Sequence, residues 1–331
     1  MAVVPQRESR QRVLLLGATG TIGRATARAL VRQGHDVVCV VRPGGTAKAR
    51  GVLPIEVATR ELSLDSVASI ARDAFGGDRI DAVVSCMASR TGVPRDAWAV
   101  DHRAHHHVLE AARQAGVARF VLLSAICVQK PQLAFQQAKL AFERELMDSG
   151  LTWSIVRPTA YFKSLSGQVE RVQQGKPFLV FGDGTLTACT PISDDDLGTF
   201  IAGCLTDPAR ANCVLPIGGP GPAITPRQQG ALLFSLLGRP PRFTHVPVRL
   251  LDVIIGVLRT LGMVIPPLGD KAELARIGRY YATESMLVWD AERGRYDADA
   301  TPSFGSETLA DHYAQMLRGE VADDRGEHAV F

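Results

Sequence analysis

Short runs of apolar residues alternate with longer amphipathic segments over the first half of the chain. The runs Val13–Leu16 and Val37–Val41 are each long enough for one buried strand and are bounded by polar residues, glycine or proline. Several of the segments between the runs carry apolar positions three and four residues apart, which is typical of a helix that packs one face on a core. We therefore predict strands at 13–16, 35–42, 54–58, 80–86, 119–124 and 152–157, and helices at 20–34, 63–75 (capped by Ser63), 95–116 and 135–150.

This alternation predicts an α/β fold with a doubly wound parallel sheet of the Rossmann type. The rhythm changes after Pro158, where glycine and proline punctuate shorter segments. We expect a disordered N-terminal arm at 1–11 and a Rossmann domain at 12–160. A smaller substrate-binding part should follow at 161–318, with a late strand at about 213–217 returning to the sheet, and a flexible tail at 319–331.

Three glycines spaced three apart, Gly17, Gly20 and Gly23, follow the first apolar run. Glycines between a strand and a helix let the backbone approach a pyrophosphate, and the free amides of the helix N-terminus favour that anion. The spacing G-x-x-G-x-x-G differs from the G-x-G-x-x-G fingerprint, but the strand before it and the helix after it are the required context. We predict a dinucleotide site formed by Gly17, Thr19, Gly20, Thr21, Ile22 and Gly23.

Arg42 ends the second predicted strand, where a site selective for NAD usually carries an aspartate or glutamate for the ribose hydroxyl. An arginine can instead hold a ribose 2′-phosphate through charge-assisted hydrogen bonds. Lys48 and Arg50 follow close by in the sequence. The residue types at this position therefore indicate NADPH as the cofactor.

Composition narrows the class of protein further. The net charge of +3 is too small to indicate a nucleic-acid partner. The six cysteines form no C-x-x-C pair and several lie in apolar runs, which indicates free thiols in a reducing compartment. Residues 1–12 are polar and lack the core of a signal peptide, so we expect a cytoplasmic protein.

The end of the fifth strand and the helix after it resemble the short-chain dehydrogenase/reductase superfamily. That superfamily places a serine after the fifth strand and a Tyr-x-x-x-Lys motif on the next helix, which assigns catalytic roles to Ser124 and Lys139. Phe135 stands where the tyrosine belongs, and a phenyl ring has no proton to donate. The chain is therefore not expected to reduce carbonyl groups. Hydride addition to a conjugated carbon–carbon double bond remains open, because the acceptor spreads the charge over its own π system.

Several longer segments resemble a narrower family, the 3,8-divinyl chlorophyllide 8-vinyl reductases, which are atypical NADPH-dependent members of that superfamily. The resemblance spans roughly residues 12–315. It implies an enzyme of (bacterio)chlorophyll biosynthesis that reduces the C8 vinyl group of a Mg-tetrapyrrole to ethyl. Without a plastid transit peptide before the first strand, a bacterial cytoplasmic enzyme is the better expectation. The matching segments lie at 123–131, 157–165, 181–184, 191–194, 215–221 and 277–286.

Further candidates lie inside the matching segments. Pro158 and Thr159 follow the sixth strand and are expected to contact the nicotinamide carboxamide. Lys163 has two interpretations, contact with a tetrapyrrole propionate or a surface lysine, and Tyr280 and Tyr281 are both possible proton donors. The expected substrate-contacting residues are Phe135, Tyr161, Phe162, Lys163, Tyr280 and Tyr281.

Two features have competing interpretations. The histidines at 102, 105, 106 and 107 lack the additional ligand spacing of a zinc site, so we predict no metal. Residues 246–268 are apolar but interrupted by Arg249, Asp252 and Arg259, which excludes a transmembrane helix. This zone could be a core helix, a lid over a flat apolar substrate, or a helix that makes peripheral contact with a membrane.

Two alternative functions remain open at this stage. One is another atypical NADPH-dependent reductase, of the isoflavone-reductase type, and the other is a non-enzymatic NADP-sensing regulator, since such regulators often lack the tyrosine. A regulator needs no large apolar ligand surface, whereas this chain has one after residue 240. The sequence does not determine the oligomeric state or the choice between chlorophyllide and protochlorophyllide.

Overall fold

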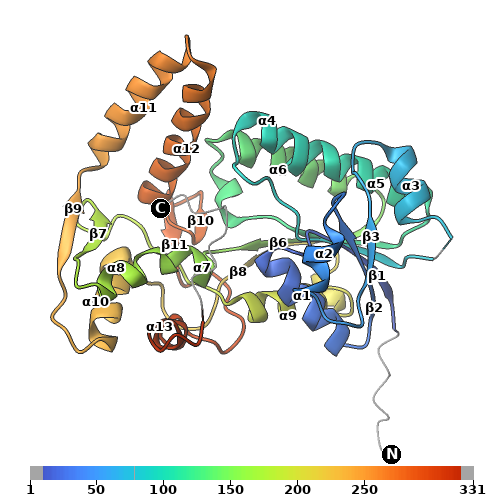
Figure 1. Cartoon of the computed structure of the whole chain (residues 1–331), viewed down its shortest axis with the longest axis horizontal. Helices are drawn as coiled ribbons and strands as arrows, with labels where there is room; N and C mark the ends of the chain where they lie inside the picture. The colour runs from blue at the N-terminus through green and yellow to red at the C-terminus, as the bar shows by residue number, and fades with distance from the viewer. Residues whose placement is uncertain (1–9, 78, 322–331) are drawn as a thin grey trace, which may run out of the picture.

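Seven parallel strands form the central sheet of this computed structural model, which describes residues 10–77 and 79–321 (Figure 1). The strand order β3-β2-β1-β4-β5-β6-β8 reverses direction between β1 and β4, as in a doubly wound fold. The predicted fold class is therefore confirmed, including the late strand that returns to the sheet edge. The strands are β1 Arg12–Leu16, β2 Asp36–Val41, β3 Ala58–Glu61, β4 Ala82–Ser85, β5 Arg119–Leu123, β6 Thr152–Pro158 and β8 Cys213–Ile217.

Helices cover both faces of this sheet, because successive side chains of a strand point to opposite sides. Val13 and Leu15 of β1 pack in the core beneath α1 (Thr21–Arg32) and α9 (Asp194–Gly203). Leu14 and Leu16 pack in the opposite core, beneath α3 (Val67–Ala74), α5 (His105–Gln114) and α6 (Ala134–Met147). Continuous apolar runs are thus buried on both faces, as the sequence pattern indicates.

Two predicted boundaries are wrong, and both lie at the edge of the sheet. The third strand, expected at 54–58, is Ala58–Glu61, because residues from Pro54 onward form a turn closed by the Val57 amide. This edge strand is polar and half-exposed, so it carries no apolar signal. Ser63 does not cap the next helix; Ser66 does, by accepting a hydrogen bond of 3.2 Å from the Ser69 amide.

The long helix predicted at 95–116 contains a wide central turn. It consists of α4 (Pro94–Ala97), a π-helical segment (Trp98–Ala104) and α5. A π-helical turn rotates the side chains around it and is frequent at functional sites. In this chain it carries Asp101, which is buried.

The second half of the chain builds a smaller core beside the sheet. Short helices and a two-stranded parallel sheet enclose a cluster of apolar side chains that includes Phe234 and Tyr313. A small antiparallel pair of strands follows later in the chain. The remaining elements are α2 Thr46–Arg50, α7 Phe162–Leu165, α8 Val169–Gln173, β7 Phe178–Phe181, α10 Pro226–Leu236, β9 Phe243–Val246, β10 Val288–Asp290, β11 Arg295–Asp297, α13 Leu309–Leu317 and 3-10 turns at Ile126–Gln129, Ser166–Gln168 and Pro208–Arg210.

A helical hairpin of α11 (Val248–Gly262) and α12 (Pro266–Thr283) rises away from the rest of the molecule (Figure 1). No residue of α11 is buried, so the interpretation of the zone 246–268 as a core helix is wrong. The helix is apolar as the sequence indicates, but about half of its apolar side chains are exposed to solvent. Among the described residues, no helix combines the length and the apolarity needed to cross a membrane.

Candidate active site

The glycine turn between β1 and α1 leaves no room for side chains at two of its glycines. Gly17 has φ +71°, and a Cβ there would lie 2.6 Å from the backbone carbon of Cys86 at the end of β4. A Cβ on Gly23 would lie 2.1 Å from the Gly17 oxygen. These glycines therefore hold the turn close to the neighbouring strand.

The middle of the same turn is open. Gly20 is exposed and Thr19 and Thr21 are half-buried, at the point where the first amides of α1 have no intrahelical acceptor. Ile22 is 9 % exposed and belongs to the core, so only its amide faces this region. A bare backbone cradle at a helix N-terminus fits the pyrophosphate of a dinucleotide.

Arg42 follows β2 at the same edge of the sheet, and its side chain is exposed. The loop behind it is fixed by Glu61, which accepts hydrogen bonds of 2.6 Å from the Gly44 amide and from the Thr46 hydroxyl. These hydrogen bonds hold the pKa of Glu61 below its usual value. The carboxylate of Glu61, which lies beside Val41 at the end of β3, is thus occupied with the loop that follows Arg42.

Lys139 lies on the inner side of α6 and donates a hydrogen bond of 2.9 Å to Asp101 of the π-helical turn. The same carboxylate oxygen accepts 3.1 Å from the amide of Ser89, in the loop after β4. The Asp101 side chain is fully buried and the Lys139 side chain is 12 % exposed. A buried carboxylate therefore fixes the direction of the lysine ammonium at the carboxyl edge of the sheet.

His105, the first residue of α5, lies one turn after Asp101 and contacts the neighbouring strand. Its Nδ1 lies 2.8 Å from the Val100 carbonyl and its Nε2 lies 2.8 Å from the Ser85 hydroxyl. Burial, followed by the charge of Lys139, lowers the pKa of His105 to about 4. The neutral ring thus donates through Nδ1 and accepts the Ser85 proton at Nε2.

Ser124 is brought to the carboxyl end of β5 as predicted, but its hydroxyl is engaged. It donates a hydrogen bond to Glu143 of α6, and the fully buried Glu143 also pairs with Arg157 of β6. The Ser124 side chain therefore ties β5 to α6 and β6 instead of presenting a free proton.

Side chains at and after the end of β6 are mostly turned into the protein. Thr159 is 7 % exposed and donates its hydroxyl proton to the Thr190 carbonyl, while Pro158 pairs with Ile217 of β8. Phe162 is buried and its ring lies 5.3 Å from that of His312. The structure therefore places it in the smaller core with Phe234 and Tyr313, and the predicted contact with the substrate is wrong for this side chain.

Lys163 lies against the glycine turn, which neither interpretation of the sequence anticipated. Its ammonium donates a hydrogen bond of 2.6 Å to the hydroxyl of Thr21, the first residue of α1. The side chain is half-buried and bonded to the turn, so it differs from a fully solvated surface lysine, and its contact with a tetrapyrrole propionate stays a prediction. A cation at this position adds positive charge to the N-terminus of α1.

Phe135 forms part of an apolar cluster between α6 and α12. It is 8 % exposed and shares this cluster with Ile277 and Tyr280. The loop around Gly92 packs over it, since a Cβ on that glycine would lie 3.5 Å from the Phe135 ring. At the position of the superfamily's tyrosine, this chain therefore has a buried phenyl ring surrounded by apolar side chains.

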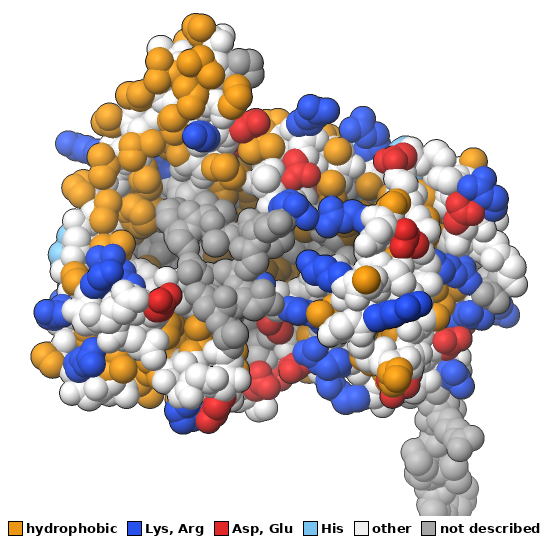
Figure 2. All heavy atoms as spheres, in the orientation of Figure 1, with side chains coloured by type: hydrophobic (Ala, Val, Ile, Leu, Met, Phe, Trp, Pro, Cys, Tyr) orange, Lys and Arg blue, Asp and Glu red, His pale blue; other side chains and the backbone are white. Residues whose placement is uncertain are grey.

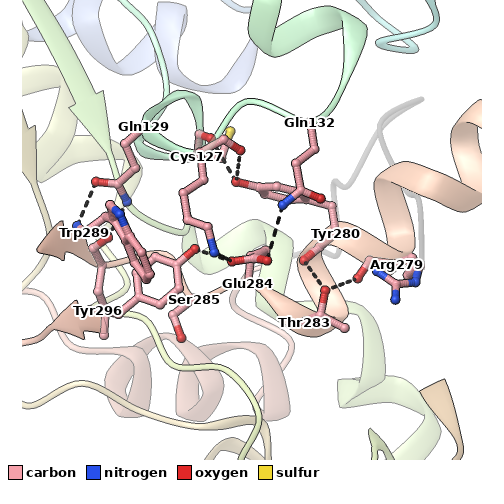
Figure 3. Close-up of polar contacts among 12 residues, drawn as sticks. Cys127, Gln129, Gln132, Arg279, Tyr280, Thr283, Glu284, Ser285, Trp289 and Tyr296 are labelled. Atoms are coloured by element: carbon pink, nitrogen blue, oxygen red, sulfur yellow. Dashed lines mark hydrogen bonds and ion pairs between the residues drawn. The ribbon is translucent and has the colours of Figure 1, made fainter. Parts of the chain in front are cut away.

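The two adjacent tyrosines of α12 have different environments. Tyr280 is buried and its hydroxyl lies within hydrogen-bond distance of the carbonyls of Cys127, at 2.9 Å, and Lys130, at 3.1 Å (Figure 3). Its proton is therefore committed to the backbone. The same loop is fastened further by Lys130, whose ammonium lies 2.6 Å from Glu284 and 4.3 Å from the centre of the Trp289 ring.

Tyr281 is 40 % exposed overall, but its hydroxyl lies 3.8 Å from the buried thiol of Cys127. Burial of the hydroxyl, followed by the influence of Cys127, raises its pKa well above the usual value. Burial also raises the pKa of Tyr161, and Cys127 contributes to that shift as well. The Tyr281 phenol and the Cys127 thiol therefore lie together beside the apolar cluster, while Tyr161 packs against the core of the main sheet.

The histidine cluster is explained by a carboxylate. His102 and His106 lie 2.7 and 2.9 Å from the two oxygens of Glu145, and His107 contacts the Leu64 carbonyl. Within residues 10–77 and 79–321, no group of His, Cys, Asp and Glu side chains has the arrangement of a metal site.

Sequence reasoning missed three residues of this site. Asp101 and Glu143 lie on predicted helices, and Cys127 lies in a 3-10 turn that was not predicted, but the partners of all three come from other elements of the fold. Each is a polar residue on a helix or turn whose apolar neighbours are buried, and that signal alone does not separate a site residue from a solvent-facing one.

Comparison with known proteins agrees with this geometry. A family model described as NAD(P)H-binding matches residues 17–208. The chain is 51 % identical to the chloroplastic divinyl chlorophyllide a 8-vinyl-reductase of Oryza sativa subsp. indica, over 96 % of this chain and 82 % of the rice protein. It is 47 % identical to the protein of that name from Arabidopsis thaliana, over 95 % of this chain and 79 % of the relative.

Among solved structures, an isoflavone reductase is similar in fold. It superposes with a TM-score of 0.66 at 17 % identity, covering 93 % of this chain and 100 % of that chain. Identity at this level shows the shared fold alone.

Proposed function

The chain belongs to the NAD(P)H-binding family and, within it, to the divinyl chlorophyllide a 8-vinyl-reductases, and on that basis we propose how its residues perform the reaction. The chain is an oxidoreductase of chlorophyll biosynthesis that reduces the C8 vinyl group of a 3,8-divinyl Mg-tetrapyrrole to ethyl. The single observation in the geometry that supports this chemistry is Phe135. It places an apolar ring, buried beside α12, where a carbonyl reductase needs a phenol.

The cofactor of this proposal is NADPH, which supplies the hydride when it is bound. The turn at Gly17–Gly23 would hold the pyrophosphate through the amides of α1, with Lys163 next to Thr21 as an added cation. Arg42 is exposed at the end of β2, on the side where the 2′-phosphate is expected. Pro158 and Thr159 would present backbone to the carboxamide, because the Thr159 hydroxyl is already bonded to Thr190.

Lys139 is proposed to orient the nicotinamide ribose, with Asp101 as its positioning residue. The ammonium–carboxylate distance of 2.9 Å fixes the lysine, and the remaining ammonium protons are available for ribose hydroxyls. Ser124 would act indirectly, by keeping Glu143 of α6 and Arg157 of β6 in place.

Protonation of the reduced substrate is assigned to Tyr281. Of the two tyrosines of α12, Tyr280 donates to the backbone, whereas the polar contact of the Tyr281 hydroxyl within the described part of the chain is a weak one, with the Cys127 thiol. Its raised pKa keeps the proton on the phenol at neutral pH. Tyr161, which is electrostatically linked to the same thiol, would line the substrate beside it.

A spectral assay tests the activity. Purified protein is mixed with NADPH and 3,8-divinyl chlorophyllide a, and the Soret band is followed, because loss of the vinyl group shortens the conjugated system. A blue shift accompanied by oxidation of NADPH supports the proposal. The same assay with divinyl protochlorophyllide ranks the two substrates. An unchanged Soret band with both substrates, in protein that binds NADPH, would contradict it.

We expect residues 12–160 to bind the cofactor and residues 161–318 to supply most of the substrate contacts. The plant relatives are named chloroplastic, so a cytoplasmic location for this chain is an expectation that cell fractionation would test.

A further inference from the structure

The hairpin of α11 and α12 carries more apolar surface than protein covers. Around α11, side chains follow one another by 100°, so positions three and four apart share a line along the helix. Leu251, Ile255 and Leu258 form one half-buried line, and α11 packs along α12. A second apolar line is open to solvent, with exposed fractions from 39 % to 61 %: Leu250, Val253, Ile254, Val257 and Leu261.

This exposed line belongs to a firmly built hairpin. Gly262 and Gly269 meet backbone to backbone, since a Cβ on Gly262 would lie 2.7 Å from the Gly269 amide nitrogen. Near the base, Asp252 of α11 forms an ion pair with Arg279 of α12. The two helices therefore hold each other through their inner faces, and the outer line of α11 stays uncovered.

The apolar surface continues around the tip. Met263, Val264 and Ile265 connect the helices and are 78 %, 83 % and 50 % exposed. Figure 2 shows hydrophobic side chains over the flank and the end of this projection. Surfaces of this kind, contiguous and apolar, mark interaction sites in proteins.

The charges nearest the tip lie at similar heights on the two helices. Residues 260–269 include no charged side chain, and Arg259 and Asp270 with Lys271 bound this stretch. At 1.5 Å per residue, the charge-free cap is about 7–9 Å deep on each helix. That depth matches the roughly 5–10 Å to which an interfacial segment enters the boundary between headgroups and acyl chains.

We propose that the tip of the hairpin inserts into the surface of a lipid bilayer. Met263, Val264 and Ile265 enter the acyl boundary with Leu261 behind them, and Arg259 and Lys271 stay among the headgroups. A lipid surface accepts a projecting apolar tip of any shape, whereas a protein partner would need a pocket that surrounds it. The inference concerns the hairpin alone and stands independently of the reaction.

Vesicle sedimentation tests this proposal with the full chain and no substrate. Wild type is centrifuged with vesicles of phosphatidylcholine, with and without phosphatidylglycerol, beside a variant carrying Met263→Asp and Val264→Asp. Ile55→Asp is the matched control, since Ile55 is 96 % exposed and precedes β3, which lies on the other side of the molecule from the hairpin in Figure 1. Wild type and the control should sediment with the vesicles, and the double variant should bind roughly tenfold or more weakly, because charged groups resist leaving water.

Failure of wild type to sediment, or equal binding by the double variant, would overturn the proposal. Gel filtration tests the alternative that a second copy of the chain covers this surface. A wild-type dimer that the double variant disrupts would support that alternative and overturn the proposal. A second readout uses Val264→Trp with lipids that carry nitroxide quenchers. Quenching by shallow probes supports insertion, and absence of quenching by any probe contradicts it.

Discussion

At the scale of single residues, tertiary partners decide which candidate groups are free to act. Ser124 and Tyr280 both donate their protons to carboxylate or carbonyl oxygens inside the protein, whereas Arg42 is exposed and the Tyr281 hydroxyl contacts a weakly bonding thiol. Lys139 shares its ammonium with Asp101 and so has a fixed direction. Three substitutions separate these roles.

The first concerns the choice of cofactor. Arg42→Asp should weaken NADPH binding by roughly ten- to a hundredfold, because a charge-assisted contact to a phosphate contributes about 1.5–3 kcal/mol. NADH binding should change much less. Arg144→Asp makes the same charge change on the exposed side of α6 and serves as the control. Calorimetric titration measures both cofactors, and unaltered NADPH affinity in Arg42→Asp would remove this residue from the site.

The second concerns the missing tyrosine. Phe135→Tyr should leave the rate of vinyl reduction level or lower it. The new hydroxyl enters an apolar cluster, where an unpaired hydroxyl costs about 1–3 kcal/mol. Rates measured across pH provide the check. If the variant were much faster and its pH profile followed a new phenol, proton donation would be the limiting step and the proposed division of roles would be wrong.

The third concerns the proton donor. Tyr281→Phe should lower kcat by about 10²-fold, the lower range for loss of a general acid, with little change in NADPH affinity. Tyr280→Phe is the matched control, since it removes a neighbouring phenol that donates to the backbone. It should lower stability by about 1 kcal/mol and keep kcat. Equal kcat in wild type and Tyr281→Phe would assign protonation to water or another group.

At the scale of elements, the β1–turn–α1 unit and the long helix through Asp101 position the site. Both were visible in the apolar periodicity, but the π-helical turn that aims Asp101 was not. The glycine turn is held by contacts with the end of β4, so its shape depends on a neighbouring strand as well as on its own sequence.

Substitution of a turn glycine tests that dependence. Gly17→Ala should destabilise the fold by about 2–5 kcal/mol, from the left-handed backbone and the overlap with Cys86, and should weaken NADPH binding at least about tenfold. Gly116→Ala is the control, because its φ of +72° is similar but no atom lies within 4 Å of the added Cβ. It should cost only about 1–2 kcal/mol. Equal losses in urea unfolding would show that the contact with β4 is unimportant.

At the scale of the whole molecule, parallel strand order gathers the ends of β1, β2, β4, β5 and β6 at one edge of the sheet. Segments from the second half then close around that edge, as the contacts of Lys163 with α1 and of Tyr280 with the loop after β5 show. The free energy of unfolding and the geometry of the active site therefore depend on some of the same buried side chains.

His105 makes this coupling dependent on pH. Its folded pKa of about 4 lies below the ordinary 6.5, so the unfolded chain binds more protons between these values and stability falls as pH decreases. Between pH 7 and pH 5, His105 alone should lower the free energy of unfolding by about 2 kcal/mol. Asp194, with its pKa raised to about 6 by burial, acts in the opposite direction between pH 4 and 6.

Comparison with a variant isolates the histidine from Asp194. Wild type and His105→Gln are unfolded by urea at pH 7 and pH 5, and the change in free energy of unfolding should be less unfavourable in the variant, where the opposing effect of Asp194 remains. If both proteins lost the same free energy of unfolding, His105 would not be the group that titrates.

The sequence by itself determined the parallel sheet, the glycine turn, the late strand at 213–217 and the pairing of Phe135 with Lys139 on one helix face. These features depend on periodicity and on local backbone geometry, which a chain carries in its own residue order. The polar edge strand β3 escaped this reasoning because its residues carry no apolar pattern.

Only the tertiary structure decided which side chains meet. The contacts of Lys163 with Thr21 and of Tyr281 with Cys127 join residues more than a hundred positions apart, and no local pattern encodes them. The apolar zone at 246–268 is the clearest case, because periodicity reports that a surface avoids water but not whether protein, substrate or lipid covers it. Packing leaves the outer line of α11 open, and that fact is a property of the assembled fold.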